Sequence, residues 1–327
     1  MTIAITRDGA RLARLPINAT TLGVRIAELR RPLVTTYAGR VDLARARYAM
    51  GKAAELYAAL VQPFAPELAG KTRLFISADG PLHARAFDAL VAPSSAAAGA
   101  AADYKTAQYL FDSYEVEYLP SPAFLRPPSE RFRGQRLATA RVLAVGYDAP
   151  GSSEEIQGLR EVWPRRQLVT LESSTATKGA VKRQMPHFGV LHFAVHATAD
   201  ARDPLASHLR LAADSADDGF LHANEIAGTR IVADLVVLSA CETNAGPIYS
   251  GEGVMGIARA FLASGARAVV GTQWPIGAES AVLMRQFYTR LAAGDAPGTA
   301  LRAAKLLLRT APATAHPVYW AGFMLVR

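Results

Sequence analysis

The sequence predicts an α/β fold in which helices flank a mainly parallel β-sheet. The main observation is that short apolar segments alternate with segments of helical periodicity from residue 141 onward. Such alternation implies right-handed crossovers between parallel strands and a sheet covered on both faces. Composition agrees, because 50% of the residues are hydrophobic and 20% are charged, as in a compact globular protein. The length of 327 residues is enough for two domains or one large domain.

The first part of the chain gives fewer signals, and the stretch Ser121–Arg136 gives the strongest sign of a domain boundary because it is rich in Pro and contains Gly. We therefore divide the chain into residues 1–125 and 126–327. The elements predicted before the boundary are a helix over Val41–Val61 that ends at Pro63, a strand over Leu74–Ala78, a turn at Asp79-Gly80-Pro81, a helix over Lys105–Ser113 and a strand over Glu115–Leu119.

After the boundary the pattern becomes regular. The predicted strands are Arg141–Val145, Gln167–Leu171, Gly189–Val195, Leu235–Ala240, Ala268–Gly271 and Phe323–Val326, and the predicted helices are Glu154–Val162, Lys178–Met185, Val254–Ser264, Ala278–Ala292 and Thr299–Thr310. A hairpin follows the third of these strands, since His208–Ala212 precedes the turn Asp217-Asp218-Gly219.

The charge and the cysteine content of the chain exclude some classes of function and argue against others. Lys and Arg number 36 against 28 Asp and Glu, and the densest basic stretch is Arg126–Arg141. This stretch is either a contact for nucleic acid or another anionic partner, or a solvated linker, and we favour the linker because no recognition motif accompanies it. The single cysteine excludes an internal disulfide and a Cys-based zinc cluster. We find neither a signal peptide nor an apolar run of about 20 residues, so we expect a cytoplasmic protein without a membrane partner.

Two residues at predicted strand ends carry the functional argument. His196 follows the strand that ends at Val195, and Cys241 follows the strand that ends at Ala240. In an open parallel sheet, reacting groups collect beyond the carboxyl ends of the strands. An imidazole within reach of a thiol can accept its proton and create a nucleophilic thiolate. The alternative is that Cys241 is a buried core residue, which is common for a lone cysteine.

Other candidate sites carry less weight. His192 lies within a strand, and we interpret it as a core histidine whose polar atoms are satisfied. The remaining histidines and acidic residues form no cluster with the spacing of metal ligands, so we expect no metal. The glycine pattern at 251–256 matches G-x-G-x-x-G, but it follows a loop and not a strand, which argues against a dinucleotide site. We therefore expect no cofactor.

Longer motifs show a family resemblance. They are LHFAVH at 191–196, VVLSACET at 236–243, GEGVMGIARAF at 251–261, the Trp274-Pro275 pair and HPVYW at 316–320. The sequence closely resembles the CHAT-domain family of caspase-like and separase-like cysteine peptidases, whose members are often associated with tetratricopeptide repeats. The resemblance extends upstream to Leu56-Tyr57, so it covers nearly the whole chain.

The resemblance implies a caspase-like sheet in which an N-terminal pseudo-peptidase half packs on a C-terminal peptidase half. It implies a His196–Cys241 dyad that cleaves protein substrates after Arg or Lys, under control of a regulatory or activating protein partner. The backbone N–H groups of Ala197 and Cys241 would bind the oxyanion. Candidate acidic residues for a basic substrate side chain are Asp200, Glu242 and Glu279.

The sequence departs from the family pattern at two places. Ala197 stands where the family usually has Gly after the histidine, and Ile276, Gly277 and Ala278 follow Trp274-Pro275 where many relatives carry an acidic residue. These departures keep a second hypothesis open, in which the chain is a catalytically silent pseudo-peptidase that docks other proteins. Direct nucleic-acid binding is a third and weaker alternative.

Overall fold

The computed structural model describes residues 1–39, 47–84, 86–96, 103–125, 134–200, 203–239, 241–242, 253–274, 277 and 279–327. The strands are β1 (Thr2–Ile5), β2 (Ala10–Ala13), β3 (Arg73–Ser77), β4 (Glu115–Leu119), β5 (Val142–Tyr147), β6 (Leu168–Glu172), β7 (Val190–Thr198), β8 (His208–Arg210), β9 (Phe220–His222), β10 (Leu235–Leu238), β11 (Cys241–Glu242), β12 (Val269–Thr272) and β13 (Phe323–Val326). The helices are α1 (Ala19–Gly39), α2 (Met50–Leu60), α3 (Ala65–Leu68), α4 (Pro93–Ala96), α5 (Leu110–Ser113), α6 (Gly134–Ala138), α7 (Ser152–Val162), α8 (Lys178–Gln184), α9 (Ala223–Ala227), α10 (Gly253–Ala263), α11 (Glu279–Ala292) and α12 (Pro297–Thr310).

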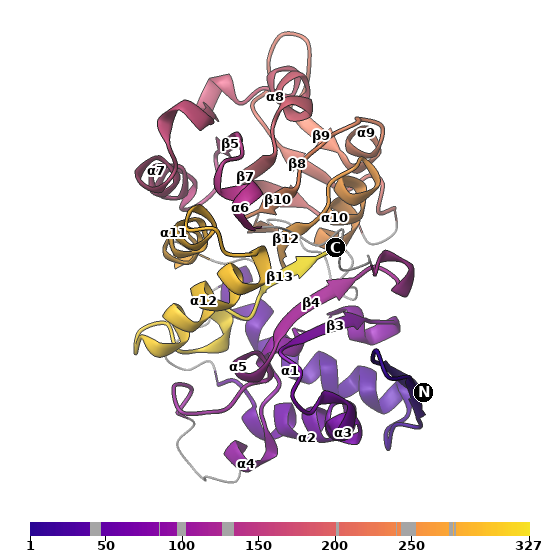
Figure 1. Cartoon of the computed structure of the whole chain (residues 1–327). Helices are drawn as coiled ribbons and strands as arrows, with labels where there is room; N and C mark the ends of the chain where they lie inside the picture. Colours follow the sequence, from indigo (N-terminus) through magenta and orange to yellow (C-terminus); the bar gives the residue numbers. More distant parts are fainter. Residues whose placement is uncertain are drawn as a thin grey trace.

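A single mixed sheet forms the centre of the molecule, with the strand order β3-β4-β13-β12-β10-β7-β5-β6. All neighbouring pairs along this path are parallel except β12 and β13. The predicted α/β class with a mainly parallel sheet is therefore confirmed. Figure 1 shows β13 in the middle of the molecule, between β12 and β4, so the C-terminal strand joins the two parts of the chain edge to edge.

Helices cover both faces of this sheet because its central strands are apolar on both faces. Along β5, Val142 and Ala144 contribute to one apolar core, and Leu143 and Val145 contribute to another. The first core contains residues of α7, α11 and α12, and the second contains residues of α8, α9 and α10. This continuous run of apolar residues is typical of parallel strands that are buried on both sides.

Strand β7 is the longest strand of the sheet and supports three further short strands. Beyond its pairing with β5 and β10, its last residues pair with β8 in antiparallel and with β11 in parallel orientation. The predicted hairpin after β7 is present as β8 and β9, which pair from His208↔His222 to Arg210↔Phe220.

Most elements after residue 134 lie within a few residues of their predicted positions, but two predictions in the first part are corrected. The helix predicted over Val41–Val61 begins only at Met50, and residues 40–46 lie outside the described part. Tyr48 is held outside the helix because its N–H donates to the Tyr104 hydroxyl at 3.0 Å, and its own hydroxyl donates to the Ala89 carbonyl at 2.7 Å. These tertiary contacts override the local periodicity.

The helix predicted over Lys105–Ser113 is also shorter than expected: its α-helical part is Leu110–Ser113. Tyr109 instead forms an antiparallel bridge with Val91, which diverts the chain before the helix begins. Sequence patterns also did not identify the β1–β2 hairpin or helix α1, which contains Pro32.

A buried ion pair joins α12 to the N-terminal part of the chain. The Lys305 ammonium lies 2.5 Å from an Asp88 oxygen, and the two side chains are 3% and 4% exposed. The Tyr118 hydroxyl donates to the other Asp88 oxygen at 2.8 Å, and the Phe87 N–H donates to the Tyr118 oxygen at 2.9 Å. Removing one member of such a pair leaves a buried charge without compensation.

We therefore predict that Lys305→Met lowers the free energy of unfolding by about 3–5 kcal/mol, measured by urea denaturation. The matched control is Lys52→Met, because Lys52 pairs with Glu28 at the surface, where both side chains are nearly half exposed. Loss of this exposed pair is expected to cost about 1 kcal/mol or less. Equal effects of the two substitutions would contradict the role assigned to the Asp88–Lys305 pair.

Candidate active site

The candidate site lies at the carboxyl edge of the parallel strands β5, β6, β7 and β10. Strand β10 pairs with β7 from Leu235↔Val190 to Leu238↔Phe193, an offset of 45 residues. Strand β11 pairs Cys241 with His196, which keeps the same offset. The backbone therefore places Cys241 next to His196 on adjacent strands, whose axes are about 4.8 Å apart.

His196 lies inside β7 and not beyond its end, so the predicted strand end is wrong by three residues. The strand continues to Thr198 because β8 supplies a neighbour on one side, with His196↔Arg210, and β11 supplies one on the other. These extra strands extend the sheet past the point where apolar periodicity ends. The prediction that His196 lies at the carboxyl edge near Cys241 is unaffected, since the pairing brings the two residues together.

Ala197 is 3% exposed and is paired on both sides, with Leu209 of β8 and with Glu242 of β11. The residues with positive φ other than glycine, in the described part of the chain, are Asp148 and Ser173. Ala197 therefore has an extended backbone that alanine adopts without strain. Alanine in place of the glycine common in the family does not distort the strand here.

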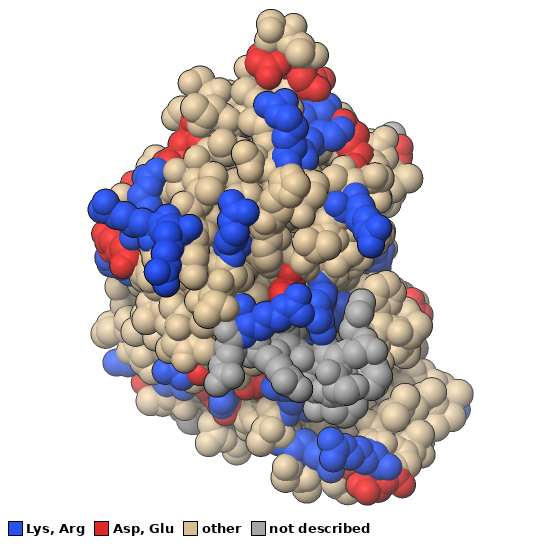
Figure 2. Space-filling model, turned by 45° about the horizontal axis from the view of Figure 1, so that its top comes forward, with Lys and Arg blue, Asp and Glu red and all other residues tan. Residues whose placement is uncertain are grey.

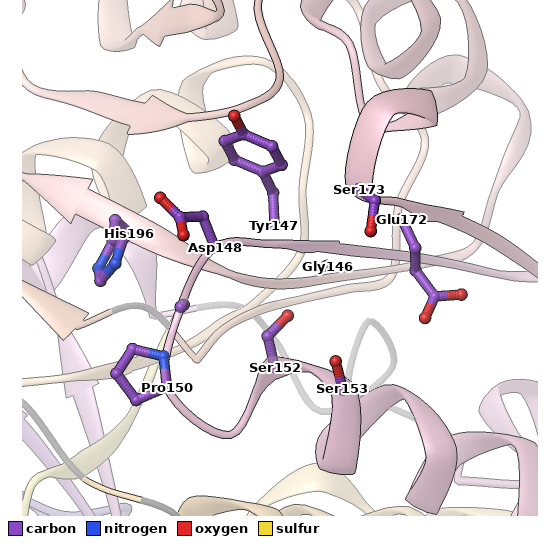
Figure 3. A pocket seen from close by; sticks show the side chains of 10 residues that line it. Gly146, Tyr147, Asp148, Pro150, Ser152, Ser153, Glu172, Ser173 and His196 are labelled. Atoms are coloured by element: carbon purple, nitrogen blue, oxygen red, sulfur yellow. The ribbon is translucent and has the colours of Figure 1, made fainter.

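The His196 side chain borders a pocket of about 370 Å³. Its Nδ1 atom is buried and has no hydrogen-bond partner among the described residues. The described residues that line the pocket are Gly146, Tyr147, Asp148, Ala149, Pro150, Ser152, Ser153, Glu172, Ser173 and His196. They come from the carboxyl ends of β5, β6 and β7 and from the start of α7, and Figure 3 shows His196 and Asp148 at one end of the group and Glu172 at the other.

Two carboxylates of this pocket were missed by the sequence reasoning. Asp148 follows β5 with φ 49°, and Glu172 ends β6, directly before Ser173 with φ 50°. Each carboxylate has an arginine neighbour: Asp148 lies 3.4 Å from an Arg210 nitrogen, and Glu172 forms a close ion pair with Arg160. The strand-end rule that identified His196 and Cys241 also points to these two positions, because β5 and β6 end at the same edge.

The acidic residues predicted for substrate binding are not among the described residues that line this pocket, and their role stays a prediction. Asp200 follows β7; its N–H donates to the Ser207 hydroxyl at 3.0 Å, and its carboxylate accepts from the Asp203 N–H at 3.0 Å. Glu279 begins α11, and neither residue lines the pocket next to His196. Glu242 lies in β11, with its Cα paired to that of Ala197.

The start of α7 is held tightly against the strands that carry the site. The Ser152 hydroxyl donates to the Ala194 carbonyl of β7 at 2.7 Å. A Cβ atom at Gly146 would lie 2.8 Å from the Ser152 hydroxyl oxygen and 3.0 Å from an Ile156 carbon. Glycine at this position therefore allows the helix to approach β5 closely, and this approach closes one wall of the pocket.

A cluster of polar side chains lies within the apolar layer next to the site. His192 is fully buried, as predicted for a core histidine, but its Nε2 atom has no hydrogen-bond partner among the described residues, so the prediction that its polar atoms are satisfied is wrong for that atom. Its Nδ1 lies 3.1 Å from the Tyr288 hydroxyl, and its Nε2 lies 3.3 Å from a Glu155 oxygen. Burial raises the pKa of Tyr288 well above its usual range, and the nearby Glu155 raises it further. Tyr288 thus stays protonated and can donate to His192.

The motifs at 274–275 and 316–320 contribute to packing. The Trp274 indole N–H donates to the Val318 carbonyl at 2.9 Å, and the Trp320 indole N–H donates to the Ala315 carbonyl at 3.1 Å. Both indoles are at most 2% exposed. The glycine-rich motif at 251–256 lies partly outside the described residues, and its described part begins α10 at Gly253.

Surface charge on the face shown in Figure 2 and the metal-ligating residues of the described part can be compared with this site. Lys and Arg side chains stand in separate groups on the face shown in Figure 2, with acidic side chains among them. In the same described part, no three His, Cys, Asp or Glu side chains are grouped as a metal site would require, and no helix is both long and apolar enough to cross a bilayer. Residues 126–133 of the basic stretch Arg126–Arg141 lie outside the described residues.

Comparison with known proteins identifies the family. The model of the CHAT domain matches residues 51–327. Human and mouse tetratricopeptide repeat protein 28 are each 34% identical to this chain over 107 residues, which is 32% of this chain and 4% of each relative. The chain thus corresponds to about 4% of the length of these curated relatives.

Among solved structures, the separase–securin complex of Saccharomyces cerevisiae matches with a TM-score of 0.42 and 11% identity, over 68% of this chain and 14% of that one. The match to the CHAT family covers most of the chain, from α2 to the C-terminal strand, and includes both His196 and Cys241. This chain therefore belongs to the CHAT domain family.

Proposed function

We propose that this protein is a cysteine endopeptidase in which Cys241 and His196 form the catalytic dyad. The observation that carries the proposal is the pairing of the two residues on adjacent strands at the carboxyl edge of the sheet. Paired residues of neighbouring strands share one face of a sheet. A thiol and an imidazole in this relation can exchange a proton, which is the requirement for a nucleophilic thiolate.

The proposed reaction has two steps. His196 accepts the proton of the Cys241 thiol, and the thiolate attacks the peptide carbonyl carbon. The tetrahedral intermediate collapses when the C–N bond breaks and His196 donates that proton to the leaving amine, which leaves a thioester. His196 then removes a proton from water, which hydrolyses the thioester and restores the thiol. We assign stabilisation of the oxyanion to the backbone N–H groups of Cys241 and Ala197.

We further propose that the substrate carries Arg or Lys before the cleaved bond. The pocket beside His196 supports this specificity because it contains the carboxylates of Asp148 and Glu172. The contact between Asp148 and Arg210 is largely exposed, with half or more of each side chain accessible, so it is a weak pair that a substrate guanidinium can displace. Asp148 is the acidic residue that lies with His196 at the same end of the pocket.

A regulatory or activating protein partner is part of the proposal. Its support is the name of the human and mouse relatives, which are tetratricopeptide repeat proteins and far longer than this chain. We propose that the protein substrate and this partner bind to separate surfaces, because the substrate is proposed to occupy the pocket beside His196. The chemistry proposed for the dyad requires neither a metal nor a cofactor.

The first prediction concerns the dyad. Cys241→Ala abolishes hydrolysis of fluorogenic peptides that end in Arg or Lys, and His196→Ala lowers kcat by roughly 10²- to 10⁴-fold, because the general base is lost. The matched control is His187→Ala, since His187 is exposed and lies before β7. If the wild type in the presence of a candidate activator gives no more signal than Cys241→Ala, the chain is the silent pseudo-peptidase.

The second prediction separates the acidic candidates. Asp148→Asn lowers kcat/KM for peptides with Arg before the cleaved bond by about 10- to 100-fold, because a charge-assisted hydrogen bond is lost. Asp200→Asn and Glu279→Gln are the matched controls and leave kcat/KM within about twofold. If either control lowers kcat/KM as much as Asp148→Asn does, the substrate side chain is recognised outside this pocket and the prediction is wrong.

A further inference from the structure

Glu155 is a buried carboxylate in the first turn of α7, and its side chain points at the sheet. Its side chain is 2% exposed, and the strand residues around this carboxylate are mostly apolar. Burying a carboxylate is costly, and an apolar side chain of similar volume often serves stability equally well. Its position therefore calls for an explanation beyond packing.

One Glu155 oxygen binds the strand that leads to Cys241. The hydroxyl of Ser239 donates to Oε1 of Glu155 at 2.7 Å, and Ser239 is 8% exposed. Ser239 follows the last residue of β10 and precedes Cys241 by two positions. This bond therefore holds the chain directly after β10, two residues before Cys241 in the sequence.

The other Glu155 oxygen faces the strand that carries His196. Oε2 lies 3.3 Å from Nε2 of His192, which precedes His196 by four positions on β7 and so lies on the same face. The Tyr288 hydroxyl lies against Nδ1 of the same ring, and the Nε2 atom and Oε2 of Glu155 are in contact without the geometry of a hydrogen bond. Glu155 thus contacts both strands of the proposed dyad, each one a short distance before its reactive residue.

A third contact reaches the helix that follows β12. The Ser280 hydroxyl, 3% exposed in the first turn of α11, donates to the same Oε1 atom that accepts from Ser239. The two serines therefore share one carboxylate oxygen, and α11 is tied to the end of β10. Together the contacts join α7, β7, the residue after β10 and α11 around one carboxyl group.

We propose that Glu155 is a positioning residue that holds the Cys241 strand in register with the His196 strand, so that thiol and imidazole can exchange a proton. The inference rests on the proposed dyad. Glu155 touches neither reactive group; it acts through Ser239 on one strand and through His192 on the other. Without the Glu155 carboxylate, β10 and β7 still pair through their backbones. The short pairing of β11 with β7 then has no side-chain contacts from Glu155 beside it.

The test measures the reactivity of the Cys241 thiol and needs neither a substrate nor an activator. Cys241 is the one cysteine of the sequence, so the rate of alkylation by iodoacetamide, followed by intact mass, reports on this thiol alone. The rate depends on the thiolate fraction, which the imidazole raises. Replacing His196 with Ala is expected to slow alkylation by about tenfold or more, and this variant tests the dyad.

Glu155→Gln and Ser239→Ala are expected to slow alkylation by about threefold or more, at a temperature where each variant is folded by its melting curve. Ser239→Thr keeps the hydroxyl and is expected to restore a rate near that of the wild type. The matched control is Glu154→Gln, because Glu154 precedes Glu155 on α7 and is exposed, and its rate is expected not to change.

The outcomes separate the two proposals. If His196→Ala reacts as fast as the wild type, the dyad is wrong, and the positioning role falls with it. If His196→Ala slows the reaction while Glu155→Gln and Ser239→Ala react like the wild type, the dyad stands and the role of Glu155 is overturned. A lower melting temperature with an unchanged alkylation rate also overturns it, because Glu155 would then serve stability alone.

Discussion

The rest of the structure depends on the pairing of β7 with β10 and β11 in one register. The offset of 45 residues holds from Leu235↔Val190 to Cys241↔His196, so the two strands run side by side to the edge of the sheet. A slip of either strand by one residue would move each of its side chains to the opposite face, into the other apolar core. The two apolar cores therefore also specify which residue lies opposite His196.

The apolar layers fix this register, and the polar cluster around Glu155 lies within one of them. Val190, Ala194, Leu235 and Val237 belong to the core on the α7 and α11 face, His192 lies between Val190 and Ala194 on β7, and Ser239 directly follows β10. Apolar contacts tolerate small shifts, whereas hydrogen bonds require defined distances. A layer of hydrogen bonds is therefore suited to the last residues before a site that needs a fixed geometry.

The N-terminal part is joined to the site region through the sheet and through buried polar contacts. Strand β13 pairs with both β12 and β4, and Lys305 on α12 reaches Asp88. Arg30 of α1 donates to the Gln273 carbonyl at 3.2 Å, directly after β12. The segments on either side of the predicted boundary at 125–126 thus share one sheet, and that boundary remains a prediction.

The sequence by itself determined the α/β class and the order of most strands and helices after residue 134, although not α6, α9 or the short strand β11. It could do so because buried parallel strands are continuous apolar runs and amphipathic helices have a clear period. Only the tertiary structure decided that β7 extends past His196, that Tyr48 lies outside its helix, and that Glu155, Asp148 and Glu172 lie beside the site. The physical reason is that these outcomes depend on partners distant in sequence: β8 and β11 for β7, Ala89 and Tyr104 for Tyr48, and the strand ends for the carboxylates.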